Sequence, residues 1–168
     1  MNKRNLTICL KMLFVCLATV ITIDSTTAAG INLAPTEKVK VYLVAVGDNG
    51  KNGRKIGCDD SLVAVSRDVQ STSAPLKAAL EELLSMPEES NESGRKLENF
   101  WKGGELKLAS VSVRKGTATI KISGTLPVAG ICDEPRIIEQ IEATAKQFKT
   151  VKKVKVTLNG TALKDAIR

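Results

Sequence analysis

The stretch DEPRIIEQIEATAKQFKTVKKVKVTLNG, from Asp133 to Gly160, indicates the fold class of this 168-residue chain. Its first half places apolar residues three and four positions apart, which is the period of a helix with one buried face. These residues are Ile137, Ile138, Ile141, Ala145 and Phe148. Its second half alternates Val and Leu with lysines, as in a strand with one face in solvent, and Asn159-Gly160 predicts a turn. The stretch therefore predicts a domain that mixes helices with sheet.

Three segments upstream predict two strands and a helix. Residues 38–46, KVKVYLVAV, and 61–69, SLVAVSRDV, are rich in β-branched and other apolar residues, which favours strands. A turn-rich loop separates them. Residues 73–85, SAPLKAALEELLS, carry Pro75 in the first turn and a stripe of leucines and alanines, which predicts an amphipathic helix.

Residues 105–124, ELKLASVSVRKGTATIKISG, predict a hairpin that turns at Lys115-Gly116. The second arm alternates apolar and polar residues without interruption. In the first arm the apolar residues lie at even positions up to Leu108 and at odd positions from Val111, so they would face opposite sides of a regular strand. We therefore expect a β-bulge near Ala109 and Ser110.

Residues 86–104, MPEESNESGRKLENFWKGG, have the Pro, Ser, Asn and Gly content of a loop. We expect one helical turn near residues 97–101. This segment contains Phe100 and Trp101, two of the few aromatic residues of the chain. They either pack over the edge of the sheet or a helix, or form a contact patch for a protein partner, as exposed aromatic residues in loops often do.

The element order β-β-α-β-β-α-β predicts the α+β class. We expect two layers: one mostly antiparallel sheet of about five strands, with both helices on one face of that sheet.

The first 29 residues have the order of a secretory signal peptide. Basic residues precede an apolar run of about twelve residues, which is shorter than the roughly 20 that a membrane-spanning helix needs, and small residues follow. We expect a cleaved signal at 1–29, a polar lead-in at 30–37 and one domain at 38–168. The protein would then be exported to the extracellular space, a periplasm or the outer face of the cytoplasmic membrane.

Removal of the signal takes away Cys9 and Cys16 and leaves Cys58 and Cys132. Two cysteines in an exported chain predict a single disulfide, which would close a loop of about 75 residues and stabilise the fold by about 4.5 kcal/mol. A thiol at a helix N-terminus can also be a reactive nucleophile. Two carboxylates beside Cys132 oppose that role, and the chain has no histidine to serve as a base, so the disulfide is favoured.

That disulfide would bring four carboxylates into one neighbourhood: Asp59, Asp60, Asp133 and Glu134. They would repel one another unless a cation or basic groups lay among them, so a calcium site is one interpretation. In the other, they cap the second helix, face solvent or pair with Arg54, Lys55 or Arg136. Because no spaced ligand loop is present, we favour the second interpretation and expect no metal and no other cofactor.

Five lysines lie at the end of the second helix and on the exposed face of the last strand: Lys146, Lys149, Lys152, Lys153 and Lys155. Such a run is usually a solvated face. Outside the cytoplasm it can also attract an anionic envelope polymer or lipid headgroups, in a salt-dependent manner. Nucleic acid is not expected as a partner, because the chain is predicted to be exported and has few aromatic residues for base stacking.

Over roughly residues 39–163 the chain resembles the GerMN domain, also called the sporulation and spore germination domain. The resemblance is carried by VYLVAVGDNG, by LVAVSRDV with APLKAALEELLS, by VSVRKGTATIKISGTL and above all by CDEPRIIEQIEATAKQFKTVKKVKVTLNG. In that last stretch the marker residues are Gln140, Ile141, Thr144 and Phe148. The cysteines in IGCDD and GICDEPR resemble the pair found in exported single-domain members.

The resemblance implies a small α/β interaction module of bacterial envelope or sporulation assemblies, without established catalytic residues. We therefore expect a non-catalytic interaction or structural module of the cell envelope with a protein partner. The alternative is a binder of an anionic envelope polymer or membrane surface through the lysine-rich face. An enzyme is not expected, because the absence of histidine leaves only the carboxylate cluster as a catalytic candidate.

Overall fold

The computed structural model describes residues 35–102 and 106–168. The predicted signal peptide at 1–29 and residues 30–34 of the predicted lead-in lie outside the described residues. Within the described ranges, no helix has the length and apolar character needed to cross a membrane.

Five strands form the first sheet in the order β2-β3-β1-β5-β4. They are β1 (Thr36–Ala45), β2 (Arg54–Lys55), β3 (Ser61–Gln70), β4 (Glu89–Glu92) and β5 (Arg95–Glu98). β1 and β3 pair antiparallel along their whole length, and β5 joins β1 where Glu98 lies opposite Val44. The strands predicted at 38–46 and 61–69 are confirmed.

The hairpin of β4 and β5 occupies the segment 86–104 that was expected to be a loop, and the helical turn expected at 97–101 is wrong. Ser93 and Gly94 have φ angles of 52° and 77°, a left-handed pair that reverses the chain tightly between the two strands. Leu97 is the apolar side chain of this hairpin that is fully buried. One apolar residue among polar and charged ones produces no strand periodicity, so the sequence pattern does not predict this hairpin.

Four strands form the second sheet in the order β6-β7-β8-β9. They are β6 (Lys107–Arg114), β7 (Thr117–Ser123), β8 (Lys153–Leu158) and β9 (Thr161–Ala162). β6 and β7 form the predicted hairpin, which turns at Lys115-Gly116, and the register shift between Leu108 and Ser110 confirms the predicted bulge. β8 runs parallel to β7, and the other pairings are antiparallel.

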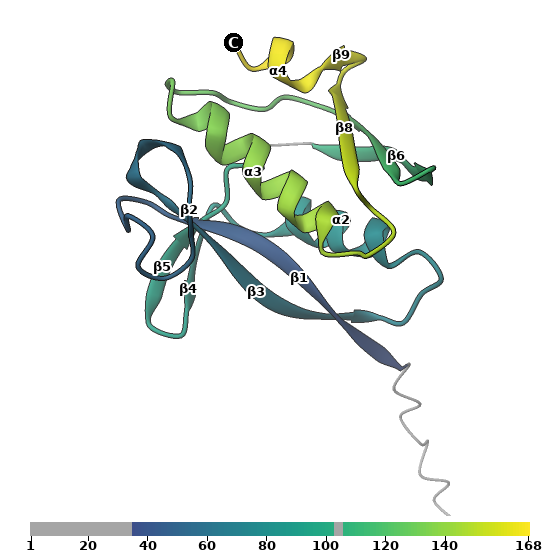
Figure 1. Cartoon of the computed structure of the whole chain (residues 1–168), viewed down its shortest axis with the longest axis horizontal. Coiled ribbons are helices and arrows are strands. Elements are labelled where there is room, and N and C mark those ends of the chain that lie inside the picture. Colours follow the sequence, from purple (N-terminus) through teal and green to yellow (C-terminus); the bar gives the residue numbers. More distant parts are fainter. Residues whose placement is uncertain (1–34, 103–105) are drawn as a thin grey trace, which may run out of the picture. The chain divides into compact units, whose positions relative to one another are not determined.

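Helices contact both sheets (Figure 1). They are α2 (Pro75–Ser85), α3 (Asp133–Lys146), the short α4 (Leu163–Ala166) and the single 3₁₀ turn η2 (Gly57–Asp59). α3 lies against β1 and β8, and α2 lies against β1, β3 and β6. The α+β class and the mostly antiparallel pairing are confirmed, but the strands are divided between two sheets rather than joined in one.

A single core explains this division. Both sheets direct apolar side chains toward the helices, and these side chains belong to one cluster. Its fully buried members include Val41, Leu43, Leu80, Leu83, Ile120, Ile137 and Ile141. Because α2 and α3 carry broad apolar faces, they can cover strands of both sheets at once.

Candidate functional site

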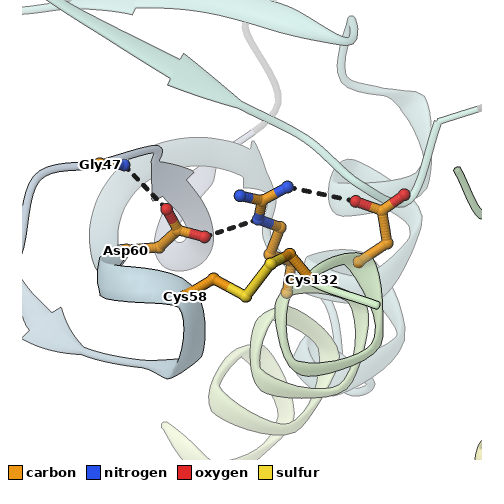
Figure 2. Close-up of a disulfide and its surroundings, with 6 residues drawn as sticks. Gly47, Cys58, Asp60 and Cys132 are labelled. Atoms are coloured by element: carbon orange, nitrogen blue, oxygen red, sulfur yellow. Dashed lines mark hydrogen bonds and ion pairs between the residues drawn. A yellow bond between two sulfur atoms is a disulfide. The ribbon is translucent and has the colours of Figure 1, made fainter. Parts of the chain in front are cut away.

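A disulfide joins Cys58 in η2 to Cys132, the residue that precedes α3 (Figure 2). Their Cα atoms lie 5.8 Å apart, within the usual range for a disulfide. The pairing is the one that the cysteine count predicts. Cys58 and Asp59 have φ angles of 60° and 56°, in the left-handed region that side chains other than glycine seldom adopt. The cross-link therefore anchors an unusual turn to the start of a helix.

Arg136 bridges the buried carboxylates of Asp60 and Asp133. Figure 2 shows Asp60 beside the disulfide. The Nε of Arg136 donates to Asp60 at 2.6 Å and its Nη1 donates to Asp133 at 3.2 Å. The other oxygen of Asp60 accepts the Gly47 N–H at 2.8 Å, and that of Asp133 accepts the Ala129 N–H at 2.8 Å. Backbone and guanidinium donors thus satisfy both carboxylates.

The electrostatics of Arg136 follow from this bridge. Burial alone would lower the pKa of its guanidinium, but the hydrogen bonds and ion pairs with Asp60 and then Asp133 outweigh burial and raise that pKa. Arg136 therefore remains charged and supplies the counter-charge that a metal ion would otherwise provide.

The four predicted carboxylates do not form one cluster. Asp59 is exposed and forms an ion pair with Lys55 at 2.8 Å, separate from the Asp60–Arg136–Asp133 bridge. Glu134 lies in the first turn of α3. Among the described residues, no group of three or more His, Cys, Asp or Glu side chains is arranged to hold a metal ion.

Asp59, Asp60 and Asp133 pair with basic groups, and none of the four carboxylates caps α3. The cap position belongs to Cys132, and no side chain hydrogen-bonds to the free N–H groups there. The expected capping by Asp133 or Glu134 is therefore wrong, because both residues already lie inside the helix.

Phe100 and Trp101 belong to the core. Their exposed fractions are 7% and 0%. The indole Nε1 of Trp101 donates to the Ile137 carbonyl at 2.8 Å, and the guanidinium carbon of Arg136 lies 4.8 Å from the centre of the Phe100 ring. The two side chains pack against the start of α3, which confirms the first of the two interpretations, packing over a helix, and contradicts the alternative of an exposed contact patch.

A buried amide pair, Gln140 and Asn99, organises this region. Gln140 accepts the Phe100 N–H at 2.8 Å and donates to the Tyr42 carbonyl at 2.9 Å. Asn99 donates to the Leu83 carbonyl at 2.9 Å, and the two amides are linked at 3.3 Å. From the sequence, Gln140 stands out only as a family marker. Its position within the apolar stripe of the predicted helix also indicates a buried polar side chain that needs hydrogen-bond partners.

Of the five predicted lysines, Lys153 and Lys155 lie on β8 of the second sheet, and Lys152 directly precedes that strand. Lys146 ends α3 and pairs with Glu142, and Lys149 follows that helix. Lys149, Lys152, Lys153 and Lys155 are all exposed. In the sheet register, Lys153 lies opposite Thr117, which lies opposite Arg114 on β6. We define the basic face as six exposed cations on this side of the sheet and at its β6–β7 turn: Arg114, Lys115, Lys121, Lys152, Lys153 and Lys155.

None of the four strands of the second sheet carries an acidic residue. The sequence has no Asp or Glu between Glu105 and Asp133 or between Glu142 and Asp165, the segments that supply all four strands. Among the described residues, no ion pair within 4.0 Å involves a cation of this face. Ser110, Ser112 and Thr119 lie between these cations on the same face.

A family model described as Germane, sporulation and spore germination, matches residues 40–164. The fold is similar to the tandem GerMN domains of the sporulation protein GerM from Bacillus subtilis, with 22% sequence identity and a TM-score of 0.53. The match covers 79% of this chain and 43% of that chain. The fold is also similar to the first GerMN domain of the same protein, with 23% identity and a TM-score of 0.54. That match covers 76% of this chain and 86% of that domain. The chain thus spans less than half of the tandem structure. No curated protein matches the chain.

Proposed function

The chain belongs to the Germane family of sporulation and spore germination, and on that premise we propose that it is a non-catalytic interaction module of the bacterial cell envelope. We propose further that it binds an anionic partner through the basic face. The aromatic residues that would have anchored a protein partner are buried, which leaves this face as the exposed surface with the most distinct chemistry.

Segregation of charge is the observation that carries the proposal. Several cations elsewhere pair with acids, as in Arg67 with Glu82 and Glu92 or Lys96 with Glu89, whereas none of the six cations of the basic face has an ion pair among the described residues. Neighbouring strands lie about 4.8 Å apart and alternate residues about 6.6 Å apart along a strand. Both spacings are shorter than the Debye length of about 8 Å at physiological ionic strength, so the fields of these cations add.

The partner that fits is a polymer carrying phosphate or carboxylate groups. An open sheet face offers no enclosed pocket, but it presents regularly spaced cations with hydroxyls between them, which can donate to phosphate, carboxylate and sugar oxygens. Anionic lipid headgroups share this chemistry. The experiment must therefore separate a wall polymer from a membrane.

The test is co-sedimentation with purified cell wall and, separately, with phosphatidylglycerol vesicles, at low and high salt. The variant Lys121→Gln/Lys153→Gln/Lys155→Gln removes three charges from the basic face. The control Lys40→Gln/Lys51→Gln/Lys77→Gln removes three exposed lysines elsewhere. We expect salt-sensitive wall binding that falls at least tenfold in the first variant only. Binding that ignores salt, or equal losses in both variants, would overturn the proposal, and binding to vesicles alone would identify a membrane surface instead.

We propose that residues 1–29 direct export, so that this face meets the envelope. Mass spectrometry of the mature protein without reducing agent tests this directly. We expect an N-terminus at Gly30. The mass should be lower than that of the reduced mature chain by two hydrogen atoms, because the disulfide forms from two thiols. A mature protein that begins at Met1 would contradict cleavage.

A further inference from the structure

β6 is an edge strand with an apolar groove beside it. In the described part of the chain β6 pairs only with β7, so the backbone groups on its other side have no strand partner. The groove lies between β6, the start of α2 and the residues after α3, and its volume is about 240 Å³. Its apolar lining includes Pro75, Leu76, Val111, Val113 and Phe148. Val113 is 40% exposed there.

An edge strand beside an apolar groove can accept an added strand. The main chain of an extended peptide would pair with β6, and alternate side chains would enter the groove. The side chains of opposite parity would lie beside Ser110, Ser112 and Arg114, which face the other side of the sheet. Drug-sized ligands occupy pockets of about 300 to 1,000 Å³, so this smaller groove fits the side chains of a peptide better.

Charge selects the occupant. Lys107 and Arg114 stand at the two ends of β6, Lys115 follows in the turn, and residues 106–132 contain no acid. A second copy of the chain is disfavoured, because antiparallel pairing of β6 with itself about its centre would place Lys107 opposite Arg114 of the other copy. An acidic strand would instead place carboxylates opposite these cations.

We infer that the β6 edge and its groove bind an extended peptide that alternates acidic and apolar side chains. The peptide adds a strand next to β6, directs its apolar side chains toward Val111, Val113 and Phe148, and directs its acidic side chains toward Arg114. This site differs from the outer basic face in needing both an apolar lining and a free backbone edge, and it does not depend on polymer binding.

The test uses a labelled synthetic peptide, EVEVEVE, with KVKVKVK and the block sequence EEEEVVV as controls, titrated against the full mature protein by fluorescence anisotropy. We expect EVEVEVE to bind at least tenfold more tightly than either control. Amide hydrogen exchange should slow at β6 residues in the complex. Equal binding of all three peptides, or protection elsewhere, would overturn the inference.

A matched pair of variants isolates the groove. Val113→Glu places a carboxylate where the apolar side chains of the peptide would enter, whereas Val128→Glu makes the same change at a valine of equal exposure, 39%, outside the groove. We expect at least tenfold weaker binding for Val113→Glu and unchanged binding for Val128→Glu, with both variants folded by circular dichroism. If only the basic-face variant Lys121→Gln/Lys153→Gln/Lys155→Gln lost binding, charge attraction alone would be responsible and the inference would fail. A dimer that Val113→Glu dissociates would show that a second copy occupies the edge.

Discussion

The Arg136 guanidinium lies 2.6 Å from the carboxylate of Asp60, a residue 76 positions earlier in the chain. Asp60 is fully buried and the Arg136 side chain is 15% exposed. The Cys58–Cys132 disulfide crosses the same boundary, between the loop before β3 and the start of α3. One covalent link and one ionic link therefore hold a single junction, and they can be tested separately.

Arg136→Met should destabilise the fold by about 3 to 5 kcal/mol, because it leaves a buried carboxylate without its counter-charge. Urea unfolding at pH 7 measures this change. The control Arg54→Met breaks the exposed ion pair with Glu139 and should cost at most about 1 kcal/mol. Adding Asp60→Asn to Arg136→Met should recover part of the loss, since the unpaired charge is gone. Equal effects of the two arginine variants would contradict a buried bridge.

Cys132→Ser should lower the free energy of unfolding by up to about 4.5 kcal/mol, because the disulfide spans 74 positions and restricts the unfolded chain. Reduction of the unmodified protein should give a similar loss. We expect amide shifts in NMR spectra to change mainly in the η2 turn and at the start of α3, since these are the two segments that the disulfide joins. A loss below about 1 kcal/mol would show that the Arg136 bridge is sufficient to hold the junction.

Trp101→Ala should destabilise the fold by about 3 to 5 kcal/mol, because it empties a fully buried site and removes the hydrogen bond to the Ile137 carbonyl. Trp101→Phe should cost less, since the cavity is smaller. Urea unfolding and wall sedimentation should be measured on the same samples. Weakened binding in a Trp101→Phe protein of unchanged stability would revive a contact role for this residue.

Ser61→Ala should raise the pKa of Asp48 toward its ordinary value. The Ser61 hydroxyl, which donates to Asp48 at 2.5 Å, is the main cause of the lowered pKa of that carboxyl, and the Asn52 N–H at 2.7 Å is the second. Carbon-detected NMR titration of the carboxyl measures the change. Ser112→Ala, on the second sheet, should leave the titration unaltered.

The sign of the pH effect follows from that direction. A carboxyl whose pKa is lower in the native state stabilises the fold above its unfolded value of about 3.9, and this contribution disappears as the pH falls through the native pKa. Because Asp48 is only partly buried, solvent screening keeps the contribution small. Acid unfolding of Ser61→Ala should therefore depend slightly less on pH below about 4 than that of the unmodified protein.

The sequence predicts an element correctly where the spacing of apolar residues within that element is sufficient to identify it. The spacing of Ile137, Ile141 and Ala145 predicted α3, and the parity change in β6 predicted its bulge. The β4–β5 hairpin was missed, because its single buried apolar residue, Leu97, produces no period. Whether Phe100 and Trp101 are buried or exposed stayed open at the level of sequence for a related reason, since composition places residues in a loop without saying what covers them.

The sequence by itself determined the α+β class, the family, the cysteine pairing and the lysine-rich character of the last strand, because each depends on residue type and short-range spacing. Only the tertiary structure decided that the strands form two sheets, that Arg136 joins Asp60 to Asp133, and that Arg114 and Lys121 extend the predicted lysines into one face. These features depend on which distant segments come into contact, and that choice follows from burying the apolar faces of both sheets and both helices in a single core.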